Sequence, residues 1–149
     1  MSTLKVSTAT RNKLLDTNPF RTIFNLGFLK IYDGPVPADA DAALDAANHL
    51  LVTMTNNGGG TGLTFAAAAS GGSITKTLAE VWSGTTIAAG TATFYRLVTP
   101  TDTGALSTTE ARVQGTVGTS GADLNMTTVS LANSTSYPVD AYSIAIPTL

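Results

Sequence analysis

The chain has 149 residues, a length typical of one domain, and it has no cysteine, which excludes disulfides and thiolate metal sites. Charged residues make up only 12% of it, against about 25% in ordinary soluble domains, and the net charge is -2. With 26 Thr and 11 Ser, either hydroxyl groups replace charges on the surface or neighbouring subunits cover much of it. We expect no membrane span and no secretory signal, because no apolar run has the required length.

The first 27 residues predict a short helical N-terminal segment. Ser7 or Thr8 could cap a first helix, because a hydroxyl can accept a hydrogen bond from an N–H of the first turn. Asn18 and Pro19 are typical of a second helix start, with Asn as the cap and Pro at the first helical position. Gly27 is placed to end that helix. We therefore divide a single domain into a helical segment, residues 1–27, and a β body, residues 28–149.

This N-terminal segment is also basic. Residues 1–30 hold five basic residues and one acidic residue, whereas residues 31–149 hold three basic and nine acidic residues. Charges this widely spaced do not predict nucleic-acid binding. Three apolar side chains at positions i, i+3 and i+4 form one face, which packs either on the body of the same chain or on a neighbouring subunit. The candidate assembly contacts are Lys5, Arg11, Lys13, Phe20, Arg21, Ile23 and Phe24.

From Phe28 onward, the sequence predicts short strands separated by glycine-rich turns. The runs are rich in β-branched and aromatic residues, which favour strands. Residues 38–48, rich in Ala and Asp, fit a short helix and a loop equally well. Several short strands with turn signals indicate a mainly β fold, and we expect a β-sandwich of jelly-roll type. The expected strands are residues 28–32, 49–55, 63–68, 73–82, 91–98, 110–117, 124–131 and 139–146.

Several apolar side chains of these strands are expected in the core. Trp82 and Phe94 are the largest candidates. In the last strand, alternation places Tyr142, Ile144 and Ile146 on one face, which we expect to point toward the core.

Residues that could carry catalysis are scarce. His49 is the only histidine, and the sequence has no nucleophile frame such as Gly-x-Ser-x-Gly around it. Glu80 and Glu110 could form a carboxylate pair, but any two acids in a chain would fit that pattern equally well. We therefore predict that the protein is not an enzyme and has no catalytic residue and no cofactor.

Two further patterns are typical of ligand-binding loops but are incomplete. Asp39, Asp41 and Asp45 suggest calcium, yet an EF-hand loop starting at Asp39 requires Gly where Leu44 stands. The glycine-rich run at residues 58–62 lacks the Gly-Lys-Ser/Thr ending of a phosphate loop, and a strand is expected after it. We interpret the first pattern as a solvated acidic loop and the second as a hairpin loop.

Three stretches of the chain carry a resemblance to known proteins: residues 28–41 (FLKIYDGPVPADAD), residues 82–84 (WSG) with 90–96 (GTATFYR), and residues 112–126 (RVQGTVGTSGADLNM). Together they resemble small virion structural proteins of tailed bacteriophages, over a range from about residue 11 to residue 147. The resemblance implies a capsid decoration (cement) protein that binds between capsomers and stabilises the head. The alternatives are a head-completion, tail or fibre-associated protein, the last with sugar binding, and a small hydrolase.

This resemblance also implies partners and a location. The expected partners are the major capsid protein or other virion proteins, together with further copies of the same chain in a homo-oligomer. We expect no nucleic-acid partner and no membrane partner. The expected location is the virion, at the capsid surface.

Overall fold

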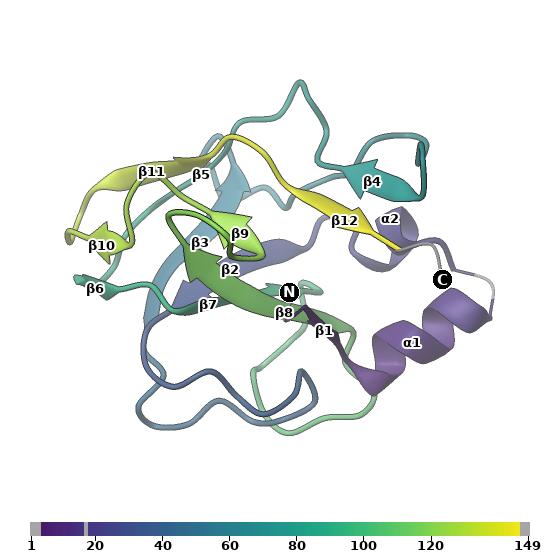
Figure 1. Cartoon of the computed structure of the whole chain (residues 1–149), viewed down its shortest axis with the longest axis horizontal. Helices are drawn as coiled ribbons and strands as arrows, with labels where there is room; N and C mark the ends of the chain where they lie inside the picture. The colour runs from purple at the N-terminus through teal and green to yellow at the C-terminus, as the bar shows by residue number, and fades with distance from the viewer. Residues whose placement is uncertain (1–3, 17, 147–149) are drawn as a thin grey trace.

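The computed structural model describes residues 4–16 and 18–146 and shows a mainly β protein (Figure 1). Residues 1–3 and 17 of the predicted N-terminal segment, and residues 147–149 of the predicted body, lie outside this range. The two helices are α1 (Thr8–Leu15) and α2 (Phe20–Ile23). The strands are β1 (Lys5–Val6), β2 (Phe28–Tyr32), β3 (Leu50–Asn56), β4 (Ser73–Thr75), β5 (Trp82–Thr85), β6 (Gly90–Thr91), β7 (Phe94–Val98), β8 (Arg112–Gly118), β9 (Leu124–Asn125), β10 (Ser130–Leu131), β11 (Ser136–Val139) and β12 (Ser143–Ala145).

One large sheet organises the molecule. Its strand order is β1-β8-β7-β2-β3-β5-β11, with antiparallel neighbours throughout, and β9 joins β8 in parallel. The pairs β6–β10 and β4–β12 form two small separate sheets. The predicted strand at residues 28–32 is confirmed at both ends, and it lies in the middle of the sheet between β3 and β7. Leu29 and Ile31 alternate on its buried face, as the period of two requires.

Five predicted strands are wrong in their extent. Residues 91–98 divide between β6 and β7, and residues 124–131 divide between β9 and β10, because the two parts of each pair with different strands. Residues 63–68 form only isolated bridges at Leu63 and Phe65, because the alanines that follow offer little cross-strand packing. The predicted strand 73–82 breaks after β4 at a turn, where Glu80 N donates to Thr77 O at 3.1 Å. Of the predicted strand 139–146, Val139 is the last residue of β11, residues 140–142 lie outside any strand, and residues 143–145 form β12.

Local details of the N-terminal segment also differ from the prediction. Residues Lys5 and Val6 form an edge strand on β8 rather than part of a helix. Pro19, not Asn18, is the N-cap residue of α2. After the helix, Leu26 rather than Gly27 adopts a positive φ, 57°. Gly27 has another reason to be glycine: a Cβ there would lie 2.6 Å from the Val98 carbonyl oxygen. Residues 38–48, for which helix and loop were equally expected, form a loop.

The core forms beneath the large sheet around an aromatic cluster. Trp82 and Phe94 are fully buried, as predicted. The Trp82 ring meets Phe65 edge-on, with 5.4 Å between ring centroids, and lies 5.5 Å from Tyr142. Ile144 is only partly buried against the core. The inward prediction is wrong for Ile146, which is 76% exposed, because the chain has left β12 one residue earlier.

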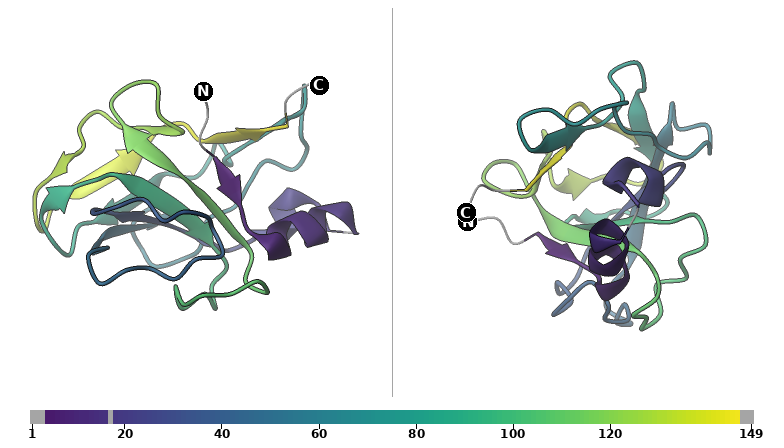
Figure 2. Two further views of the ribbon diagram at one scale, coloured as in Figure 1. Left: turned by 60° about the horizontal axis from the view of Figure 1, so that its bottom comes forward. Right: turned by 90° about the vertical axis from the view of Figure 1, so that its right-hand side faces the viewer.

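The N-terminal segment packs on the body of its own chain. Phe24 is fully buried in the core, and Phe20 and Ile23 pack against the core from outside. Ser7, the cap of α1, accepts a hydrogen bond from Thr10 N at 3.2 Å and another from Arg112 N at 2.9 Å. Of the two alternatives for the apolar face, the structure therefore shows packing within one chain, with the helices lying against one end of the sheet (Figure 2).

Candidate assembly surface

The residues considered for catalysis occupy structural positions. His49 is exposed, and its Nδ1 lies 3.0 Å from Asp33 Oδ1 on the surface. Glu80 accepts hydrogen bonds from Thr64 N and from Trp82 Nε1, both at 2.9 Å. Glu110 accepts one from the Thr99 hydroxyl. Each of these groups is thus held in a local contact of its own.

The three aspartates considered for calcium do not converge on one point. Asp41 accepts hydrogen bonds from Thr8 N and Thr8 Oγ1, so it joins the loop to α1. Asp39 and Asp45 close local turns by accepting from Ala42 N and Ala47 N. In residues 4–16 and 18–146, no group of three or more His, Cys, Asp or Glu side chains could hold a metal ion. No helix in that part of the chain is long and apolar enough to cross a membrane.

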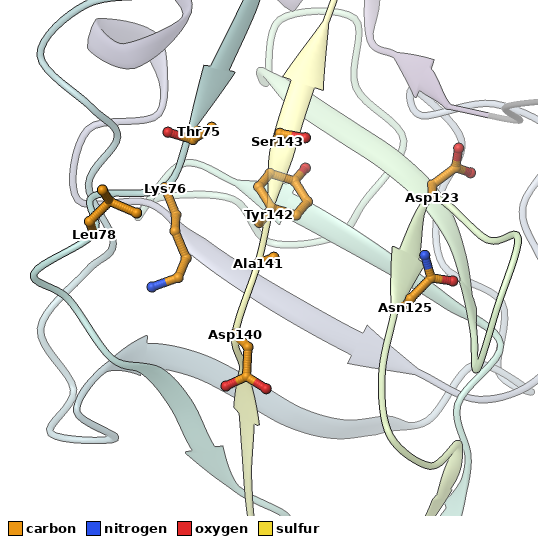
Figure 3. Close-up of a pocket in the computed structure, with 9 residues that line it drawn as sticks. All are labelled: Thr75, Lys76, Leu78, Asp123, Asn125, Asp140, Ala141, Tyr142 and Ser143. Atoms are coloured by element: carbon orange, nitrogen blue, oxygen red, sulfur yellow. The ribbon is translucent and has the colours of Figure 1, made fainter.

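A polar hollow of about 370 Å³ opens between β12, the end of β4 and the loop around β9 (Figure 3). Lys76, on its edge, donates to Glu80 O at 2.6 Å and lies 5.9 Å from the Trp82 ring centroid. Tyr142 is buried beneath the hollow, and its hydroxyl donates to the Tyr95 hydroxyl at 3.1 Å. Burial raises the pKa of both tyrosines, so both hydroxyls stay protonated at neutral pH. The hollow therefore offers polar surface but no activated nucleophile.

The predicted assembly contacts fall into three groups by exposure. Arg11, Lys13 and Arg21 are exposed, Lys5, Phe20 and Ile23 are partly buried, and Phe24 is fully buried. Lys5 Nζ donates to Ala38 O at 2.9 Å, which ties it to its own chain. Phe24 has no surface to offer a partner. Phe20 and Arg21, by contrast, lie together on the surface described next.

An apolar groove of about 380 Å³ lies between the N-terminal segment and the paired strands β4 and β12. The groove lies between β1 and β12, which are edge strands of their sheets. Leu14 and Ile146, on its rim, are exposed. The residues that line the groove are Leu4, Val6, Leu14, Pro19, Phe20, Arg21, Ala69, Gly72, Ser73, Ile74, Ile144, Ala145 and Ile146.

The surroundings of this groove are basic. Arg21 lies in its lining, and α1, which contributes Leu14, carries Arg11 and Lys13 on exposed positions. Leu15, next to Leu14 on the same helix, is 88% exposed. An apolar surface rimmed by polar groups is typical of a protein–protein contact.

Two loops next to α1 form a second distinctive surface. We call residues 33–49 and 99–110 together the double loop. Leu44 N donates to Gly104 O, and Ser107 N donates to Asp41 O, each at 3.0 Å, so the two loops are joined along their length. The double loop contains six of the ten acidic residues of the chain and no Lys or Arg.

Two buried arginines of the sheet fasten the double loop. Arg112 Nε donates to Asp102 Oδ1 at 3.0 Å, and Arg112 Nη2 donates to Ala105 O at 2.7 Å. Arg96 Nη2 donates to Ala42 O at 2.9 Å, and Arg96 Nε donates to Gln114 Oε1 at 2.9 Å. Burial, and then the neighbouring Arg112 charge, lower the pKa of Arg96. Arg112 is thus paired with the Asp102 carboxylate and a loop carbonyl group, whereas Arg96 is held by a loop carbonyl group and the Gln114 side chain.

Sequence reasoning missed both the groove and this arginine network. The groove joins residues 4–21 to residues 69–74 and 144–146, and no local pattern brings such distant segments together. Arg96 and Arg112 alternate with apolar residues in strands, which was the available signal, because a charged residue on the inward face of a strand must find partners in the fold.

Comparison of the chain with protein-family models, with curated proteins and with solved structures gives no match.

Proposed function

We propose that this chain is a non-enzymatic structural protein of a tailed-bacteriophage particle, and that it decorates the capsid, binding between capsomers and stabilising the head. The observation that carries the proposal is the apolar groove with its basic surroundings, which offers a surface for another protein rather than for a reaction. The low proportion of charged residues, 12%, fits a surface that neighbouring subunits cover. The resemblance of residues 28–41 and 112–126 to virion proteins points in the same direction.

The physical role of such a subunit is to add contact area across joints between capsid proteins. A specific contact typically buries about 1,200–2,000 Å². When one subunit bridges two neighbours, the second contact forms at a high effective concentration, so weak contacts combine into firm attachment. The proposed partners are the major capsid protein and further copies of this chain.

The jelly-roll arrangement is part of the same proposal. The pair β4–β12, two strands far apart in the chain, contributes Ile74 to the core and packs Ile144 against it from outside the large sheet, as a second layer of a sandwich would. A jelly roll requires two packed antiparallel sheets of this kind. An experimentally determined structure of the assembled protein would test it, and a single open sheet in the assembled state would contradict it.

Purified particles provide the test of the proposed function. We expect the protein to be present in hundreds of copies per particle, on the outer surface of the head. Heads that lack it should release their contents at a lower temperature, and adding the purified protein back should restore the wild-type release temperature. Absence from purified particles, or heads equally stable with and without it, would refute the decoration role.

The polar hollow favours one second candidate, a tail or fibre-associated protein that binds a sugar. Asp140, Asn125 and Lys76 line it and could form hydrogen bonds with hydroxyl groups (Figure 3). Sugars also stack on exposed aromatic rings, and no Phe, Tyr or Trp side chain within the described part of the chain is exposed. A dozen or fewer copies per particle, with binding to a glycan that Asp140→Ala abolishes, would favour this candidate over decoration.

A further inference from the structure

A single exposed leucine projects from the double loop between two anchored neighbours. Leu106 is 73% exposed. The carbonyl oxygen of Ala105 accepts the hydrogen bond from buried Arg112, and Ser107 N donates to the carbonyl oxygen of Asp41. The backbone is thus fixed on both sides of a side chain that contacts solvent.

The backbone of the loop before Leu106 is also held in a defined conformation. Gly104 has a φ of +81°, which favours glycine, and its N–H donates to Asp102 Oδ1 at 3.2 Å. A Cβ on Gly104 would lie 2.9 Å from Leu44 Cδ1, so the two loops pack closely at this point. Ordering a loop before it binds lowers the entropy cost of binding, so Leu106 is prepared for contact with an apolar partner surface.

The double loop and the groove carry opposite charges. Asp39 and Asp45 are exposed on the double loop, whereas Arg21 lines the groove and Lys13 is exposed on α1, which contributes Leu14 to the groove. Each surface therefore has an apolar element, Leu106 or the groove floor, beside charges that attract the other surface. Both surfaces belong to the same chain, so the double loop of one copy can bind the groove of another.

We propose that the double loop of one copy docks into the groove of a second copy, with Leu106 entering the groove. This inference deepens the proposed function, on which it rests, by naming a second copy of this chain as the partner of the groove. The two surfaces are different patches, so the contact is head-to-tail, and an open chain of copies has one free groove at one end and one free double loop at the other.

Complementation between two variants tests this contact. Leu106→Asp removes the apolar side chain from the double loop but leaves the groove intact. Ile146→Asp places a charge on the rim of the groove but leaves the double loop intact. Both positions are mostly exposed, so both full-length variants should fold as the wild type does. Leu78→Asp is the matched control, since Leu78 is 90% exposed and belongs to neither surface.

Sedimentation velocity over a range of concentrations measures the association. We expect wild type and Leu78→Asp to self-associate, and each of the other two variants alone to associate at least about thirtyfold more weakly, as loss of a central apolar contact implies. An equimolar mixture of Leu106→Asp and Ile146→Asp should form a 1:1 complex with wild-type affinity, because one intact groove meets one intact double loop.

Three results would overturn the inference: a wild-type protein that stays monomeric, a Leu106→Asp variant that associates as tightly as the wild type, or a mixture in which no 1:1 complex forms. Particle assays separate this failure from that of the proposed function. Self-association without incorporation into particles would refute the decoration role alone, whereas incorporation by a protein that never self-associates would refute the head-to-tail contact alone.

Discussion

Replacing Asp102 by Asn should destabilise the protein strongly. The side chains of Asp102 and Arg112 are almost completely buried, so the carboxylate is the charge that neutralises the guanidinium group. The remaining partners of Arg112 are backbone carbonyl groups, those of Ala40 and Asp41 at 3.3 and 3.4 Å and that of Ala105. Breaking a buried ion pair by removing one partner costs about 3–5 kcal/mol. Because Asn keeps one acceptor oxygen for Arg112, we expect the lower end of that range, about 3 kcal/mol.

Urea unfolding followed by circular dichroism measures this loss, with the free energy of unfolding compared at the same pH. A loss of about 3 kcal/mol is a large share of the total for a domain, which is typically about 5–15 kcal/mol. The matched control is Asp33→Asn, which weakens the exposed Asp33–His49 pair and should cost no more than about 1 kcal/mol. Equal losses in the two variants, or a loss below about 1 kcal/mol for Asp102→Asn, would show that burial of the Arg112 pair does not govern its energy.

Four further outcomes follow from the fold. Deleting residues 1–27 should abolish cooperative unfolding in circular dichroism, because it removes Phe24 from the core and β1 from the sheet edge; a folded truncated protein would contradict this. Trp82→Ala or Phe94→Ala should cost about 3–5 kcal/mol in urea unfolding, whereas Leu78→Ala, at an exposed position, should be nearly neutral. Burial raises the pKa of Tyr32 to about 12 and also raises the pKa of Tyr95 and Tyr142, so the unfolded chain releases these protons first as the pH rises. The free energy of unfolding should therefore stay constant up to about pH 10 and fall above it, by up to about 1.4 kcal/mol per pH unit for each tyrosine. A free energy of unfolding that does not change up to about pH 12 would refute this. His49→Gln should leave binding to the particle within about threefold, measured by co-sedimentation, because we assign His49 no proton transfer; complete loss in a folded variant would revive an enzymatic role.

The parts of the fold that sequence predicted well are those governed by local pattern. Residues 28–32 alternate cleanly and end at a turn in which Gly34 takes a φ of +80°, so local sequence determines both ends of β2. The glycine-rich run after β3 forms a tight turn, closed by Asn56 N donating to Thr61 O at 2.8 Å, although the strand that a hairpin loop would lead into does not form. In both cases the residues that determine the structure are neighbours in the chain.

The parts that sequence predicted badly depend on distant partners. Distant pairing decides where the predicted strand 139–146 breaks: Val139 ends β11, which pairs with β5, and residues 143–145 form β12, which pairs with β4. The pattern of Tyr142, Ile144 and Ile146 therefore could not reveal that Ile146 leaves the core. The sequence predicts the basic residues of the N-terminal segment as candidate contacts. The arginines that hold the double loop on the sheet, however, are Arg96 and Arg112, which are buried. The composition of a segment gives the number of its charged residues but not which face of a strand each of them lies on.

Arg112 connects the two surfaces of the proposed contact. Its backbone N–H and carbonyl oxygen bind the cap of α1 through Ser7 and Thr10, at the end of the molecule that holds the groove. Its side chain fastens the loop that presents Leu106. One residue therefore holds the double loop at a fixed angle to the groove, and a head-to-tail contact repeated at a fixed rotation builds either a closed ring or an open helix rather than a random aggregate. It follows that Asp102→Asn, which alters neither Leu106 nor the groove, should weaken self-association by freeing the loop. Unchanged self-association in that variant would mean that the contact does not need the loop to be fixed.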